Sequence, residues 1–281
     1  MKKYLLMIAN LAAYLGATYF VFELLVLYLY NNFEWFVTFF ERNIPLYLIF
    51  ITSVTFLLFL FIFYIKKIFL KENYKSIWSV CNFSMINRKQ MFLFTLIGLA
   101  GTLWFISFMK ITYFGERFPD LESYMEVFSR SDNFFYVFIG VGIVGVLFEE
   151  ILFRGLVFNE FNKVMPFPIA LILNAIVYGY FQPSPIIMFT GFMLGILYGL
   201  VYFKTKSIWS SIWIGIVLNV SMFTFRELKI NDAIGKLPDW VLVLTMISSF
   251  LFILISVIYL FKSESLSNNN ITPANKLELQ G

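Results

Sequence analysis

The sequence predicts an all-α fold, a polytopic membrane bundle of about eight transmembrane helices. Of its 281 residues, 60% are hydrophobic and 14% are charged, whereas an ordinary soluble domain has about 45–50% apolar and about 25% charged residues. The apolar residues gather in successive segments, and a helix needs about 20 such residues to cross a bilayer. The composition therefore excludes a soluble globule and indicates an integral membrane protein.

The chain contains eight segments that we expect to span the membrane. Lys2 and Lys3 before the first segment resemble the basic start of a signal peptide, but the apolar stretch is too long and lacks a cleavage site, so we expect a retained helix. Glu23 near the far end of this helix is expected to reach the interface rather than to act as a buried functional acid. The eight segments are residues 4–30, 44–65, 91–111, 134–158, 169–181, 186–203, 208–225 and 240–261.

The connector after the third segment has a different pattern. Leu121, Tyr124, Met125 and Phe128 recur at helical spacing among acidic residues, which predicts a short amphipathic helix at the membrane interface. With this helix we divide the chain into four parts. Residues 1–133 contain three spanning helices, a basic cytoplasmic connector and the amphipathic segment. Residues 134–225 form a core, residues 226–262 contain the last helix, and residues 263–281 form a disordered tail.

The distribution of lysine and arginine predicts the orientation. Basic residues concentrate at both termini and in every second connector, whereas the other connectors are acidic or mixed. Because cytoplasmic loops carry the excess of positive charge, both termini are expected to be cytoplasmic, as in a bacterial cell membrane protein. The net charge of +4 forms no extended patch, so the bilayer is an expected partner and nucleic acid is not.

Two absences in the composition limit the chemistry. The chain has no histidine, which excludes histidine-ligated zinc and the Ser-His-Asp and Cys-His forms of nucleophilic catalysis. Cys81 is the single cysteine, so an intrachain disulfide and a CxxC metal site are excluded as well. We therefore expect no metal and no other cofactor.

The candidate functional centre is a cluster of charges in the fourth segment. Glu149, Glu150 and Arg154 interrupt an apolar run of residues 134–158, and a charge at mid-bilayer costs about 2.5–3.5 kcal/mol on insertion scales. Glu150 and Arg154 are helical i,i+4 neighbours and are expected to pair, whereas Glu149 projects about 100° away and is left free. Either the three side chains lock this helix to its neighbours, or a carboxylate in a low dielectric activates water.

Other polar and small residues follow the charged cluster. Asn174, Gln182 and Asn219 would be costly against lipid, so each is expected to face a neighbouring helix. We predict that Glu149, Gln182 and Asn219 converge on one cavity. Glycines at positions 191, 195 and 199 line one face of the sixth segment, where they predict close helix packing rather than a ligand site.

These motifs together resemble the CPBP family, which comprises the CAAX prenyl proteases and bacteriocin-processing proteins and is also called Abi. Residues 149–154 are similar to its EExxxR signature. The resemblance then continues in order, through residues 134–224, with an FxxxH-like element at residues 178–182, a glycine-rich helix, a Ser-Ile-Trp turn at residues 207–209 and an HxxxN-like element at residues 215–219.

The resemblance implies a site from which two histidines are missing. In family members thought to be proteases, the first glutamate and two histidines activate water, and an asparagine supports the oxyanion. Here the retained motif positions are Glu149, Glu150, Arg154 and Asn219, whereas Gln182 and Gly215 stand at the two histidine positions. Glutamine cannot exchange a proton near neutral pH, and glycine has no side chain.

The resemblance leaves three functions open. The first is a pseudoprotease, a scaffold or regulator that binds a membrane protein or peptide through a degenerate active site. The second is an intramembrane endopeptidase that uses the glutamates alone on prenylated or leader peptides near the cytoplasmic face. The third is transport through the polar cavity. We favour the pseudoprotease, because both motif histidines are replaced. The resemblance in fold does not by itself establish protease activity.

Overall fold

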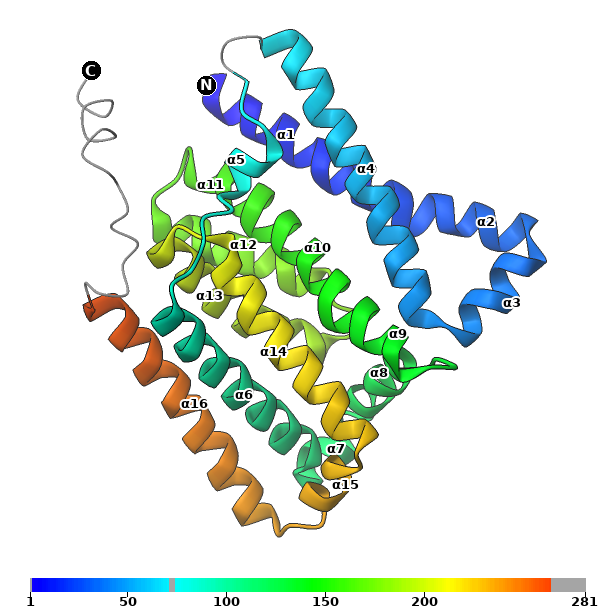
Figure 1. The fold of residues 1–281 in the computed structure, drawn as a ribbon, viewed down its shortest axis with the longest axis vertical. Coiled ribbons are helices and arrows are strands. Elements are labelled where there is room, and N and C mark those ends of the chain that lie inside the picture. The colour runs from blue at the N-terminus through cyan, green and yellow to red at the C-terminus, as the bar shows by residue number, and fades with distance from the viewer. Residues whose placement is uncertain (1, 71–73, 264–281) are drawn as a thin grey trace.

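The computed structural model describes residues 2–70 and 74–263, and the regular secondary structure in these ranges is helical, without a strand (Figure 1). The all-α membrane bundle is confirmed. Except for Ser263, the predicted disordered tail lies outside the described residues. Seven helices of the described part are long and apolar enough to cross a membrane, namely Lys2–Asn32, Ile44–Phe69, Arg88–Lys110, Phe134–Asn162, Pro185–Thr205, Ile208–Glu227 and Asp239–Lys262.

The fifth predicted segment forms a shorter helix than a full span. Helix α12 (Phe167–Tyr180) has 14 residues, or ~21 Å at 1.5 Å per residue. Proline sets both limits, because Pro168 lies in the first helical turn and Pro183 and Pro185 follow the last. The fifth predicted helix therefore exists, but by itself it is shorter than the bilayer core of about 30 Å.

Residues 2–70 form a helical unit beside the rest of the bundle (Figure 1). The first spanning helix consists of α1 (Lys2–Tyr19), the π-helical segment η1 (Phe20–Leu25) and α2 (Val26–Asn32). A short helix that the sequence did not predict, α3 (Glu34–Arg42), follows before α4 (Ile44–Leu70). Glu23 is exposed on this unit, as expected for a side chain that reaches out of the helix pair.

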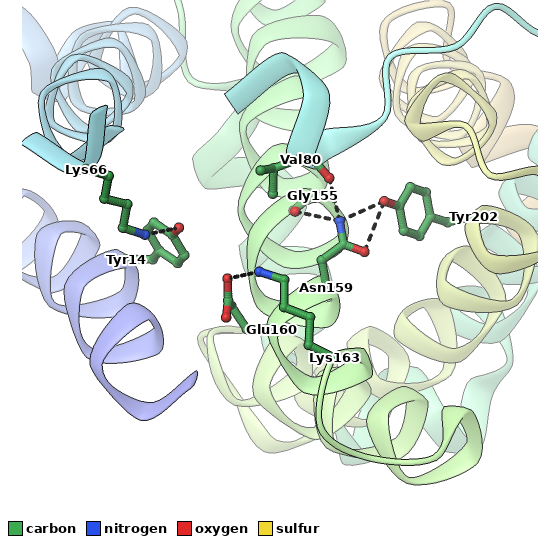
Figure 2. A network of polar contacts seen from close by, with 8 residues as sticks. All are labelled: Tyr14, Lys66, Val80, Gly155, Asn159, Glu160, Lys163 and Tyr202. Atoms are coloured by element: carbon green, nitrogen blue, oxygen red, sulfur yellow. Dashed lines mark hydrogen bonds and ion pairs between the residues drawn. The ribbon is translucent and has the colours of Figure 1, made fainter. Parts of the chain in front are cut away.

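The connector after α4 folds back against the central helix. It contains α5 (Ile77–Cys81), capped by the Ser76 hydroxyl, which accepts a hydrogen bond from the Ser79 amide. Cys81 is fully buried against Gly155, where an added Cβ would lie 2.4 Å from its sulfur. The side-chain Nδ2 of Asn159 donates a hydrogen bond to the Val80 carbonyl at 2.7 Å (Figure 2). The connector is thereby fixed to the helix that carries the glutamates.

The predicted amphipathic helix is present. After α6 (Arg88–Lys110) the chain forms α7 (Thr112–Arg117) and then α8 (Asp120–Ser129). Met125 of α8 is fully buried, and Tyr124 and Phe128 pack at 4.6 Å between ring centroids. Helix α8 therefore packs on the bundle through its apolar face, and its place at a membrane surface stays a prediction.

The central helix carries the charged cluster and is partly π-helical. It begins at Phe134 and continues without a break to Asn162. π-helical segments are rare and occur frequently at functional sites, and here one of them contains Arg154. The consecutive segments are α9 (Phe134–Ile139), η3 (Gly140–Gly145), α10 (Val146–Glu150), η4 (Ile151–Phe158) and α11 (Asn159–Asn162).

The glycine face predicted to pack closely does so. On α13 (Pro185–Thr205), an added Cβ at Gly195 would lie 2.8 Å from the Ala175 Cα of α12, and one at Gly199 would lie 2.4 Å from the Leu171 side chain. The backbones of α12 and α13 therefore approach as closely as small residues permit. The chain then completes the bundle with α14 (Ile208–Glu227), α15 (Ile230–Gly235) and α16 (Asp239–Lys262).

Candidate functional site

The ion pair predicted within the central helix is present and buried. Nη1 of Arg154 lies 2.9 Å from Oε1 of Glu150, and their side chains are 0% and 1% exposed. The guanidinium lies between two rings, 4.2 Å from the centroid of Tyr178 and 4.8 Å from that of Tyr198. Because desolvated cation–π contacts contribute about 2 kcal/mol each, the two tyrosines compensate part of the cost of burying this charge.

The pair is held more by charge and ring contacts than by hydrogen bonds. Nε and Nη2 of Arg154 and Oε2 of Glu150 have no hydrogen-bond partner among the described residues. Such unpartnered groups make removal of one member costly, because the remaining charge then stays buried alone. Glu150 and Arg154 therefore act as one structural unit.

Glu149 has a different environment, as its helical position predicted. Its Oε2 accepts a hydrogen bond of 2.8 Å from the Tyr178 hydroxyl, and the residue is partly exposed, whereas Glu150 is buried. It takes part in no ion pair among the described residues. Tyr178 thus contacts both charges: its hydroxyl binds Glu149 and its ring covers Arg154.

One cavity of about 370 Å³ lies beside Glu149. Its lining includes Glu149, Gln182 and Asn219, so the prediction that these three residues face one cavity is confirmed. The walls are otherwise mainly apolar, with contributions from both the N-terminal helices and α16. Glu150 and Gly215 also line the cavity, whereas Arg154 is not part of its lining and contacts the rings of Tyr178 and Tyr198.

Gln182 and Gly215, which the sequence resemblance suggests stand at histidine positions, have different surroundings. Gln182 packs its Cγ against Gly191, where an added Cβ would lie 2.7 Å away. At Gly215 an added Cβ would lie 2.7 Å from Cγ1 of Val146. A Cβ at residue 215 would therefore meet the Val146 side chain of the central helix. Asn219, one turn further, donates from Nδ2 to the Gly215 carbonyl at 3.1 Å.

Three tyrosines of the site were missed by the reasoning from sequence. Tyr178 and Tyr198 contact Arg154, and Tyr124 of α8 lines the cavity, where burial and the charge of Glu149 raise the pKa of its phenol. Tyr178 stands four residues before Gln182 and Tyr198 lies next to Gly199. These positions near motif residues could have indicated a role in the site. Aromatic residues make up 21% of this chain, however, so a nearby tyrosine is a weak signal. Asn174 is fully buried, as predicted for a residue facing a neighbouring helix.

We expect Tyr178→Phe to reduce the free energy of unfolding by about 0.5–1.5 kcal/mol, because it removes the hydrogen bond to Glu149 and keeps the ring over Arg154. The measurement is unfolding in mixed detergent. Tyr180→Phe is the matched control, since Tyr180 is 75% exposed on the same helix and should change stability little. Equal effects of both substitutions would show that the Glu149 contact contributes nothing.

The fold and site define an integral membrane helix bundle in which a buried Glu-Arg pair and a second glutamate adjoin an intramembrane cavity. Residues 131–221 match one protein-family model, which is described as Type II CAAX prenyl endopeptidase Rce1-like. This match confirms the resemblance to the CPBP family over residues 131–221. Comparison with curated proteins gives no match, and neither does comparison with solved structures.

Proposed function

We propose that this CAAX-protease-like membrane protein is a scaffold or regulator that binds a segment of a membrane protein or peptide in its cavity without cleaving it. The observation that carries the proposal is the packing at Gly215. An imidazole at this position would require the Val146 side chain to shift, because a Cβ would lie 2.7 Å from its Cγ1. Glycine therefore stands at the second histidine position, packed against the Val146 side chain of the central helix.

Proton transfer supports the same conclusion. Peptide hydrolysis requires a base that deprotonates water and an acid that protonates the leaving amine, and such catalysis is typically worth about 10²–10⁴-fold. Glu150 is engaged with Arg154 at 2.9 Å, so it is not free to serve as a separate acid or base. Among the described residues, the Tyr178 hydroxyl is the one group that donates a hydrogen bond to Glu149, and a phenol with an ordinary pKa of about 10 is a weak acid at neutral pH.

The cavity is suited to hold a polypeptide segment. Mainly apolar walls surround a few polar groups, which include the Glu149 carboxylate and the amides of Gln182 and Asn219. A peptide backbone presents both N–H and C=O groups that must be paired when water is excluded. Glu149 can accept from a peptide N–H, and the side-chain amides can both donate and accept. With both termini cytoplasmic, this site would lie in the cytoplasmic half of the membrane.

A second candidate function is peptide cleavage by the glutamates alone. The observation in its favour is that Glu149 is partly exposed and lines the cavity with Asn219, as a carboxylate that activates water would. The Tyr178 hydroxyl could then stabilise developing negative charge, even though it is a poor proton donor. An activity assay separates the two functions.

We expect the purified protein in liposomes to cleave no member of a lipidated-peptide library above background. In cells that lack the native gene, Glu149→Gln should restore the cellular role nearly as well as the wild type, because binding needs shape and hydrogen bonds rather than a proton-transferring carboxylate. Peptide release is measured by mass spectrometry, and complementation is measured at matched membrane expression.

Glu23→Gln is the matched control, since Glu23 is an exposed acid of a spanning helix that does not line the cavity. Cleavage that Glu149→Gln abolishes and Glu23→Gln does not would establish the endopeptidase instead. Binding is tested with a photoreactive residue at Phe181, which lines the cavity, or at Phe92, which is exposed elsewhere. Polypeptide adducts at Phe92 as strong as those at Phe181 would contradict binding in the cavity.

A further inference from the structure

A second polar cluster lies away from the cavity, where α1, α4 and the end of the central helix meet (Figure 2). Nζ of Lys66 donates to the Tyr14 hydroxyl at 2.6 Å and lies 4.5 Å from the centroid of the Tyr14 ring. Opposite this pair, Lys163 binds the buried Glu160 at 2.5 Å. The Glu160–Lys163 pair lies beside Lys66 and Tyr14 in Figure 2, so we treat the four side chains as one cluster.

This cluster has an excess of positive charge. Lys66 has no ion-pair partner among residues 2–70 and 74–263, and the one acid of the cluster, Glu160, is engaged by Lys163. Lys66 is partly buried, whereas its neighbour Lys67 is exposed. An ammonium has three N–H donors, and the Tyr14 hydroxyl takes one of them. Two donors and one uncompensated charge thus remain at the edge of a spanning helix.

The two helices that carry Tyr14 and Lys66 also have exposed apolar side chains. Leu5 and Ile8 of α1 are 62% and 57% exposed, and Ile68 and Phe69 of α4 are 54% and 79% exposed. In a membrane-spanning unit such side chains face lipid acyl chains. Helices α1 and α4 therefore combine a cation without an ion-pair partner among the described residues with exposed apolar faces, a combination that suits an amphiphile with an anionic head.

We propose that Lys66 and Lys163 bind the phosphodiester headgroup of an anionic phospholipid, whose acyl chains lie along α1 and α4. The phosphate would accept hydrogen bonds from the two remaining donors of Lys66 and neutralise the excess charge. Basic sites between membrane helices bind anionic lipid heads in this way. The site is separate from the Glu149 cavity, since neither Lys66 nor Lys163 lines that cavity.

The test titrates diacyl phosphatidylglycerol into the detergent-solubilised full-length protein and measures bound lipid by native mass spectrometry and the shift in thermal midpoint. Phosphatidylcholine with the same chains should produce no specific binding. Lys66→Gln should weaken phosphatidylglycerol binding by about fivefold or more, since one lysine near a lipid surface contributes a factor of this order. Lys66→Arg should bind within about twofold of the wild type, because arginine retains a phosphate-binding cation.

Lys67→Gln is the matched control, because it removes the same charge from the adjacent, exposed position. Equal weakening by Lys66→Gln and Lys67→Gln would show general attraction to a basic surface and overturn the proposal. Inorganic phosphate that stabilises the protein as much as the lipid does would show a free-phosphate site and also overturn it. If Lys66→Gln lowers the folded yield, Lys66→Met preserves the apolar stem and must lose the binding equally.

Discussion

Arg154→Ala is expected to reduce the free energy of unfolding by about 3–5 kcal/mol, the typical cost of breaking a buried ion pair. The substitution leaves the Glu150 carboxylate, 1% exposed, without the guanidinium that lies 2.9 Å away. It also removes the cation from between the rings of Tyr178 and Tyr198. Reversible unfolding in mixed detergent micelles measures the loss, with helix content followed by circular dichroism.

The double variant Glu150→Leu with Arg154→Met isolates the coupling. It replaces both charges by apolar groups of similar size, and such replacements of a buried pair are often neutral or stabilising. We therefore expect it to be much more stable than Arg154→Ala alone. If single and double variants lose the same stability, the two charges are not coupled in the folded protein.

Arg226→Ala is a control for the general effect of losing an arginine. Arg226 also forms an ion pair, at 3.1 Å to Glu122, but the two side chains are 25% and 51% exposed. Exposed pairs typically contribute about 0–1 kcal/mol. A loss at Arg226 as large as that at Arg154 would mean that burial is not the cause.

Gly195→Ala is expected to destabilise the protein by about 1–3 kcal/mol, as overpacking of a close contact does. The added Cβ would lie 2.8 Å from the Cα of Ala175, and backbone cannot move aside as a side chain can. Helices α12 and α13 must separate, which shifts Tyr178 away from Glu149. The prediction is checked by the same unfolding measurement.

Gly16→Ala provides the matched control. Gly16 lies in helix α1, and nothing is within 4 Å of the Cβ that alanine would add there. Because alanine is a better helix former than glycine by about 1 kcal/mol, this variant should be neutral or slightly more stable. Equal destabilisation at both glycines would mean that the α12–α13 contact is not close in the folded protein.

Much of the fold could be predicted because its signals are local. Apolar segments of sufficient length identified the spanning helices, and i,i+4 spacing identified the Glu150–Arg154 pair. The glycine repeat identified the closely packed face of α13. Helix α3 was missed because Glu34–Arg42 is only 9 residues long and mixes aromatic with charged residues, a pattern that an irregular connector shares.

The tyrosines of the site could not be chosen from sequence, because their role depends on contacts between distant helices. Tyr178 reaches Glu149 across 29 residues of chain, and 16 tyrosines are present. The close contact at Gly215 was also invisible, since it depends on where Val146 points. In each case the sequence shows which residue is present, but the residues that it contacts depend on how distant helices pack.

The shortness of α12 has a consequence for the surrounding lipid. One side of this 14-residue helix, including Ile169, Ile172 and Ile176, is about half exposed, yet its ~21 Å cannot match a hydrocarbon layer of about 30 Å. Such hydrophobic mismatch thins the adjacent bilayer. Headgroups and water are then drawn toward Gln182 at the end of α12, so that a polar molecule meets a lower barrier to the cavity there than elsewhere around the protein.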